Sequence, residues 1–248
     1  MFEGFRTARA VLRSLRIYYG NRRQRRAKDR LYGQFIHPGD LAFDIGAHVG
    51  DRVAAFRRIG ACVVAVEPQP ALARTLRMLY GRDPQVVIEE TAVGREAGSI
   101  DLRLNIDNPT VSTASADFIA AAEDAPGWQG QAWSRRLRVP LTTIDSLIAR
   151  HGKPVFIKID VEGFEAQALA GLSDAVKALS FEFTTIQRDV AYAAIERCRA
   201  LGYARFNASL GESQTLLHSD WIDGETITRW VAALPPEANS GDIYARLS

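Results

Sequence analysis

The chain has 248 residues but only two cysteines, and it contains no long apolar run. Cys62 and Cys198 are far apart and form no CxxC pattern, so neither a disulfide framework nor a cysteine zinc site is expected. No segment reaches the length of a membrane-spanning helix, and the first 20 residues hold no apolar stretch of signal-peptide length. We therefore expect a protein of the reducing cytoplasm.

Hydrophobic residues make up 47% of the chain and charged residues 24%, which is ordinary globular usage. At this length an α/β fold often forms a single domain, so one catalytic domain is the default expectation.

The net charge of +2 conceals an asymmetry. Residues 1–30 carry ten basic side chains against Glu3 and Asp29, so this segment is +8 and the rest of the chain is −6. Apolar residues recur there at helical spacing, with arginines along another side: Phe2, Phe5, Val11, Leu12, Leu15, Tyr18 and Tyr19 against Arg6, Arg9, Arg13 and Arg16.

Three interpretations of this basic amphipathic segment are open. The helix could lie on the anionic inner face of a membrane, or it could receive a polyanionic substrate. It could also pack its apolar side on the catalytic domain and leave its arginines in solvent, which is the interpretation we favour.

From about residue 40 onward, strand-like segments alternate with helical ones. This pattern predicts a doubly wound, mostly parallel seven-stranded α/β sheet. The predicted strands cover 41–47, 61–68, 85–94, 100–106, 154–163, 178–184, 203–210 and 242–248, and the predicted helices cover 51–59, 70–81, 142–152, 164–172 and 190–202. We divide the chain into a helical extension (1–36) and a catalytic domain (37–248) with an insertion at about 105–139.

The most informative segment is FDIGAHVGD, in which Asp44 ends the first strand and Gly46 and Gly50 occupy the turn into a helix. Glycines let the backbone approach a ligand, and a helix N-terminus offers free amides to an anion. A dinucleotide site would show GxGxxG with no required acid before it, whereas this loop is GxxxG after an acid. Such a loop suits S-adenosylmethionine, which carries an ammonium, a carboxylate and a sulfonium.

Glu67 ends the second strand, followed by Pro68, and can accept hydrogen bonds from both hydroxyls of a ribose. The third strand ends near Thr91 and Ala92, which we expect to border an adenine.

The segment FIKIDVEGFE places Lys158, Asp160 and Glu162 in or after a strand that should be buried. Charges are costly to bury unless they are paired or used, and ligands of open α/β sheets bind beyond the carboxyl ends of the strands. The alternative is a structural Lys158–Asp160 ion pair with Glu162 as a helix cap.

These motifs in this order, with VEPQP, TAVG, LTTIDSL and IKIDVEGFEAQALAGL after the glycine loop, closely resemble the FkbM family of methyltransferases over about residues 40–184. The resemblance implies a class I methyltransferase fold and methyl transfer to hydroxyls of sugars or polyketide-type natural products. The chain departs from the family's DxGANxG loop at His48, where asparagine is common. Cofactor contacts are accordingly expected at Asp44, Gly46, Ala47, His48, Gly50, Glu67, Pro68, Thr91, Ala92 and Asp160.

An alcohol is a poor nucleophile until its proton is being removed, so the reaction needs a general base or a metal. Asp160 and Glu162 are the leading candidates for the base, Lys158 would hold or tune them, and His48 is a second candidate. Asp160 could also bind Mg²⁺ together with Glu162 or Glu182. We assign no metal ligands among the histidines, because His37, His151 and His218 lack metal-type spacing.

The insertion is expected to close over the acceptor through Ser112, Thr113, Ser115, Trp128 and Trp133, although ordinary loop packing explains these residues equally well. Two other functions stay open. A nucleic-acid methyltransferase would fit the basic segment, but the chain lacks an NPPY-type tetrapeptide, and no nucleic-acid partner is expected. A non-catalytic, membrane-associated nucleotide-binding module is the other alternative.

Overall fold

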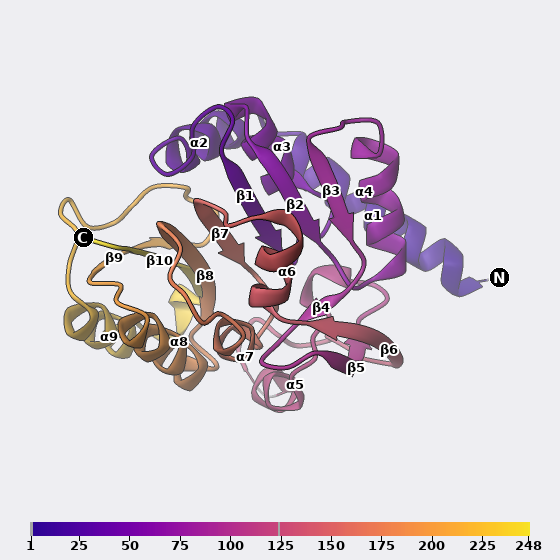
Figure 1. The fold of residues 1–248 in the computed structure, drawn as a ribbon. Coiled ribbons are helices and arrows are strands. Elements are labelled where there is room, and N and C mark those ends of the chain that lie inside the picture. The colour runs from indigo at the N-terminus through magenta and orange to yellow at the C-terminus, as the bar shows by residue number, and fades with distance from the viewer. Residues whose placement is uncertain (1, 124) are drawn as a thin grey trace.

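The computed structural model describes residues 2–123 and 125–248, with side chains from residue 6 onward. A seven-stranded sheet forms its centre, in the order β3-β2-β1-β7-β8-β10-β9 (Figure 1). β10 alone runs opposite to the other six strands, so its pairings with β8 and β9 are antiparallel and the other pairings are parallel. The strands are β1 (Leu41–Ile45), β2 (Cys62–Val66), β3 (Val86–Glu89), β7 (Phe156–Ile159), β8 (Ala178–Thr184), β9 (Arg205–Leu210) and β10 (Ser240–Arg246). The predicted doubly wound sheet is therefore confirmed.

Helices cover both faces of this sheet, because alternate residues of each strand point to opposite sides. Ala42 of β1 packs with α2 (Arg22–Tyr32), α3 (Asp51–Ile59) and α4 (Pro70–Tyr80) on one face. Phe43 packs on the other face with α6 (Ile144–His151), α7 (Glu165–Ala170), α8 (Arg188–Ala200) and α9 (Gly224–Ala233). The sequence patterns predicted all of these helices except α2, which was treated as part of the extension, and α9.

The predicted third strand is wrong in one respect, because 85–94 divides into β3 and a separate short strand, β4 (Ala92–Val93). The break falls at Glu90 and Thr91, whose hydroxyl hydrogen-bonds to Pro140 O. β4 joins β6 (Arg135–Thr142) and β5 (Gly98–Leu104) in a three-stranded sheet of order β4-β6-β5. The expected insertion thus contains a strand as well as the helices η1 (Pro109–Val111) and α5 (Ala116–Glu123).

The N-terminal segment forms two helices, α1 (Phe2–Tyr19) and α2, that pack on the domain. Ala10 and Ser14 of α1 are buried, and Leu31, Tyr32, Phe35 and Ile36 are part of the core beneath β1 and β7. The apolar side of α1 packs only in part as we favoured, because Leu12 is 58% exposed and the other described members of that side, Val11, Leu15, Tyr18 and Tyr19, are half-buried. The side chains of Phe2 and Phe5 lie outside the described residues. Over the part of the chain with described placement, no helix is both long and apolar enough to span a bilayer.

Candidate functional site

A cavity opens at the carboxyl ends of β1, β2 and β7, where ligands of doubly wound sheets bind. Its volume is about 110 Å³. The wall comes from the β1 and β2 ends, the β7 end, the region 102–114, and two distant side chains, Tyr18 and Glu212. Of the predicted site residues, it brings together Asp44, Gly46, His48, Glu67, Pro68, Thr91, Ala92, Asp160 and Glu162.

The glycine loop fixes the floor of the cavity. Gly46 has φ of 84°, and a Cβ atom there would collide with the carbonyl oxygen of Asp160, so only glycine allows this close approach. Asp44, just before it, is 2% exposed, and its Oδ2 has no hydrogen-bond partner among the described residues. Burial raises the pKa of Asp44 to about 7. A buried carboxyl with an unsatisfied oxygen indicates a missing donor.

Glu67 lies at the end of β2 and is 3% exposed. Its Oε2 accepts the His48 amide at 2.9 Å and its Oε1 accepts the Gln69 amide at 2.8 Å, which holds the carboxyl against the glycine loop. Burial raises the pKa of Glu67 to about 8, against the opposing effect of these two amides. Each oxygen retains a second lone pair, so the carboxylate can still accept hydrogen bonds from a ribose.

Lys158 is a residue of β7 and pairs with Asp160, which follows that strand. Its side chain does not line the cavity. Its ammonium is fully buried, 2.6 Å from Asp242 Oδ1 on β10 and 3.3 Å from Asp160 Oδ2. Burial works to lower the pKa of Lys158, but the charges of Asp160 and Asp242 raise it above its usual value. The ion pair of the alternative interpretation is therefore present, and it positions Asp160 at the edge of the cavity, but Glu162 does not cap α7.

Three carboxyl groups converge beside Lys158. Oxygens of Asp160, Glu162 and Glu182 lie within 4.8 Å of one another at the ends of β7 and β8. Burial raises the pKa of Asp160, but Lys158 and Arg52 outweigh it and hold that pKa below the usual value. Burial, and then the charge of Asp160, raise the pKa values of Glu162 and Glu182 well above normal. One group of the cluster is thus kept ionised while the other two favour a proton.

His48 has φ of 50°, which the loop imposes between two glycines of positive φ. Its ring lies edge-on to Tyr18, with centroids 5.6 Å apart, and its Nε2 is 3.5 Å from Thr110 Oγ1. Burial lowers the pKa of His48 to about 4, so the ring is neutral at physiological pH. Its contacts make His48 a wall of the cavity and a weaker candidate for the base than the carboxyl cluster.

The N-terminal helices contribute residues that sequence reasoning did not place in the site. Tyr18 of α1 lines the cavity, and the Lys28 ammonium lies over its ring, 5.6 Å from the centroid. Lys28 also forms a buried ion pair with Asp51, the first residue of α3. The Tyr19 hydroxyl meets Tyr80 at 2.6 Å and donates to Val49 O at 3.0 Å. The extension is thereby attached directly to the glycine loop.

Arg52 was also missed. Its guanidinium lies 3.3 Å from Asp51, 3.6 Å from Glu212 and 3.9 Å from Asp160. Arg52 links the glycine loop to the acidic cluster and to the turn after β9. The only sequence signal was its position directly after the glycine motif.

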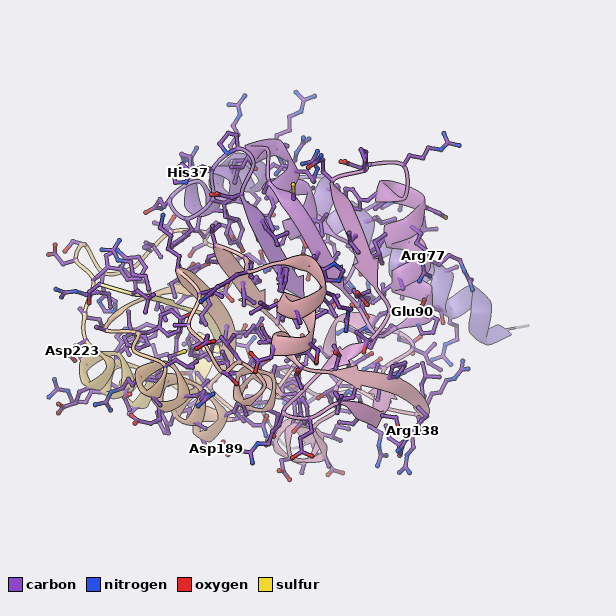
Figure 2. The ribbon with its side chains drawn as sticks, in the orientation of Figure 1. His37, Arg77, Glu90, Arg138, Asp189 and Asp223 are labelled. Carbon is purple, nitrogen blue, oxygen red and sulfur yellow. The ribbon has the colours of Figure 1, made fainter. Side chains whose placement is uncertain are left out.

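Several predicted residues lie outside the cavity. Ala47 is buried and does not line the cavity, and Gly50 is the N-cap residue of α3, where a Cβ atom would come within 2.7 Å of Leu76 and Tyr80. His37, to which we assigned no site role, lies on the upper part of the molecule in Figure 2 and does not line the cavity.

The tryptophans of the insertion pack as ordinary loop residues, which is one of the two interpretations left open, and they do not line the cavity. Trp128 and Trp133 pack around Phe118 in a separate small core. The Trp133 indole donates to Val111 O at 2.7 Å, and Trp128 to Asn239 at 3.2 Å. The remaining hydroxyl residues divide: Ser112 lines the cavity, Thr113 donates to Glu162 O, and Ser115 caps α5.

The cavity suits S-adenosylmethionine by the chemistry of its donors and acceptors. Glu67 offers a carboxylate at the strand end, the orphaned oxygen of Asp44 can accept from an ammonium, and the loop at Gly46 leaves room for close backbone approach. Thr91 and Ala92 border the same space, where we expect the adenine.

Solved structures to which the chain is similar include several methyltransferases. Precorrin-6y C5,15-methyltransferase from Geobacter metallireducens is 11% identical, with a TM-score of 0.45 over 90% of this chain and 87% of that chain. A TehB-like S-adenosylmethionine-dependent methyltransferase from Corynebacterium glutamicum is 12% identical, with a TM-score of 0.45 over 90% and 88%. These low values carry no functional argument. A comparison with curated proteins found no significant match.

The match to a family model is extensive. The methyltransferase FkbM domain matches residues 44–204, which is more than half of the chain and runs from Asp44 of the glycine loop to the start of β9. It includes Glu67 and the whole acidic segment after β7. The chain belongs to the FkbM family of S-adenosylmethionine-dependent methyltransferases.

Proposed function

We propose that the enzyme methylates a hydroxyl group of a sugar, a glycan or a polyketide-type natural product. The observation that carries this proposal is the carboxyl cluster of Asp160, Glu162 and Glu182 in the wall of the cofactor cavity. A hydroxyl acceptor needs its proton removed as the new bond forms, and a carboxyl group of raised pKa is suited to that role near neutral pH.

Glu162 is our candidate for the general base. It is 8% exposed, it lines the cavity, and no hydrogen bond to its carboxyl occurs among the described residues. S-adenosylmethionine, held by Asp44 and Glu67, would supply an activated methyl group and leave as S-adenosylhomocysteine. The acceptor proton passes to the ionised form of Glu162, which its raised pKa makes a strong base, while Asp160 stays ionised beside Lys158 and Arg52.

Mg²⁺ is the competing way to activate a hydroxyl. Asp160, Glu162 and Glu182 would supply its carboxylate oxygens, the ligands that magnesium prefers. A metal would also lower the pKa values of the two glutamates. Activity that survives exhaustive chelation, with no gain on added magnesium, would exclude this role.

The basic extension gives limited support to a nucleic-acid acceptor, because much of its charge is used internally. Arg6 pairs with Asp107, Lys28 with Asp51, and Asp29 with Arg58.

Cys62 and Cys198 are free thiols, which fits the reducing cytoplasm we propose.

The test is methyl transfer from labelled S-adenosylmethionine to matched acceptors carrying a hydroxyl, an amine or a carboxyl group. We expect label only in the hydroxyl product, stable to mild base as an ether is and an ester is not. Label confined to amines, carboxyls or RNA would contradict the proposal. Glu162→Gln is the control that must retain binding of S-adenosylhomocysteine.

A further inference from the structure

A second hollow lies beside the catalytic cavity, between α1, α4 and the three-stranded sheet. Its volume is about 580 Å³, several times that of the cavity and within the range of small-molecule sites. Figure 1 shows α1 and α4 side by side above β4, β5 and β6. We call it the α1–α4 groove.

The lining of the α1–α4 groove is mainly apolar, with 11 of its 17 residues being Ala, Val, Leu, Ile, Met or Pro. Val11, Leu12 and Leu15 come from α1, Met78 from α4, and Leu104 and Leu137 from the second sheet. Leu12 is 58% exposed and Met78 75% exposed. Large apolar side chains gathered in an exposed recess indicate a surface that a ligand or partner covers.

The groove and the catalytic cavity share a wall. Gln69 and Pro109 line both spaces, and the side-chain amide of Gln69 donates to Pro109 O at 3.1 Å. Gln69 is also the residue whose backbone amide holds Glu67. A ligand in the groove therefore lies next to the cofactor cavity.

Contacts between α1 and the loop after β5 hold one side of the groove in place. Arg6 of α1 pairs with Asp107, and Arg13 donates to the carbonyl of the same residue at 2.6 Å, so α1 is attached to the loop after β5. The recess therefore does not depend on a ligand to assemble it.

Charge narrows the choice of occupant. Arg74 and Arg135 are the ionisable residues among the lining, so no carboxylate lines the groove, and Arg74 supplies the positive charge on which the inference rests. Arg74 is exposed and forms no ion pair within the described part of the chain. An apolar chain joined to an anionic group matches both properties of this surface.

We propose that the α1–α4 groove binds the apolar chain of an anionic amphiphile, whose hydroxyl-bearing end enters the adjacent cavity as the methyl acceptor. The acceptor role of the amphiphile's hydroxyl-bearing end rests on the proposed function. The groove's affinity for an apolar chain with an anionic group is testable without any acceptor.

The test is calorimetric titration of the full chain, saturated with S-adenosylhomocysteine, with dodecyl phosphate below its micelle concentration. We expect saturable binding at one site that weakens about fourfold for each methylene removed, and none with butyl phosphate. Absence of dodecyl phosphate binding by protein that still binds S-adenosylhomocysteine would overturn the proposal.

Met78→Glu and Leu79→Glu form a matched pair on α4. Both side chains are exposed, at 75% and 45%, but only Met78 lines the groove. We expect at least tenfold weaker dodecyl phosphate binding in Met78→Glu, no change in Leu79→Glu, and unchanged S-adenosylhomocysteine affinity in both. An equal loss of dodecyl phosphate binding in both variants would indicate a general effect of the added charge and would overturn the proposal.

Two rival occupants give different results. If the α1–α4 groove instead lies on a membrane, the protein binds anionic vesicles and does not bind monomeric dodecyl phosphate. If it covers a second copy of the chain, Met78→Glu converts a dimer to a monomer in sedimentation. Either result overturns the proposal. Binding of dodecyl phosphate without methylation of any hydroxyl acceptor would instead contradict the proposed function alone.

Discussion

The two halves of the cavity wall differ in how they are assembled. The half around Asp44, Gly46 and Glu67 comes from two adjacent strand ends within 24 residues of sequence. The other half brings Tyr18 from the first helix and Glu212 from the turn after β9 to the same space. The first half carries the residues that we propose bind the cofactor, and the second encloses the cavity. On that proposal, cofactor recognition is local in sequence, whereas enclosure depends on tertiary packing.

The largest expected effect concerns the acid cluster between these halves. Glu162→Gln should reduce turnover by roughly 10²- to 10⁴-fold, because the acceptor proton loses its base. Glu182→Gln should reduce it by less than tenfold, since its carboxyl contacts Asp160 rather than the acceptor. Single-turnover kinetics with S-adenosylhomocysteine affinity as a control measures both. The reverse order would transfer the role of base to Glu182.

A stability comparison tests whether the extension braces the site. Lys28→Met removes one partner of a buried ion pair between α2 and α3 and should cost about 3–5 kcal/mol of unfolding free energy. Arg58→Met breaks the Arg58–Asp29 pair between the same helices, but that pair is about one-third exposed and should cost about 1 kcal/mol or less. Denaturant titration measures both. Equal losses would mean that the extension does not support the glycine loop through Lys28.

Cofactor recognition is tested at the local half. Glu67→Gln should weaken S-adenosylhomocysteine binding by about 10- to 100-fold, because hydrogen bonds to a charged carboxylate are replaced by weaker ones to an amide. Glu90→Gln is the control, since Glu90 pairs with Arg77 at 2.6 Å on the surface, where Figure 2 shows the two side chains together. Unchanged affinity in Glu67→Gln would remove Glu67 from the cofactor site.

The sequence could predict the local half because each motif carries its own physical signal. Asp44 before a GxxxG turn and Glu67 at a strand end are recognisable without knowing what packs around them. Tyr18 gave no such signal, because an aromatic residue on an amphipathic helix fits ordinary packing equally well. The role of Lys28 is hidden in a run of basic residues, and only the contact with Asp51 distinguishes it.

The same distinction explains the errors in the fold. β4 was merged with β3 because both are short apolar segments, and the turn at Glu90 and Thr91 lacks glycine or proline. The sequence cannot decide between an acceptor lid and loop packing for Trp128 and Trp133, because their packing against Phe118 is not revealed by sequence spacing. The three-stranded sheet likewise depends on the long-range pairing of β5 with β6.

A smaller effect tests the distant half directly. Tyr18→Ala should weaken S-adenosylhomocysteine binding by about threefold to tenfold, since it opens the wall beside His48 without removing a cofactor hydrogen bond. Ile17→Ala is the matched control, because Ile17 is the neighbouring residue, 56% exposed and absent from the cavity wall. If the two variants bind equally well, α1 is a brace for the fold and takes no part in enclosing the cofactor.

The last comparison tests the pH dependence of stability that Glu67 contributes. Its pKa rises from 4.5 to about 8 on folding, so the folded state holds a proton that the unfolded state has lost. That contribution is fully present below pH 4.5 and is lost as the pH rises through about 8. Between pH 6.5 and 8.5, the thermal midpoint of the ligand-free protein should therefore fall more steeply in wild type than in Glu67→Gln.

Saturating S-adenosylhomocysteine should reduce this difference, because hydrogen bonds from ribose hydroxyls favour the ionised carboxylate and lower its pKa. The comparison between variants isolates Glu67 from Asp44 and Glu165, whose pKa values burial raises to about 7. Identical slopes in the ligand-free proteins would show that the two amides from His48 and Gln69 already keep Glu67 ionised. In that case the local half of the site is fully preorganised before the cofactor arrives.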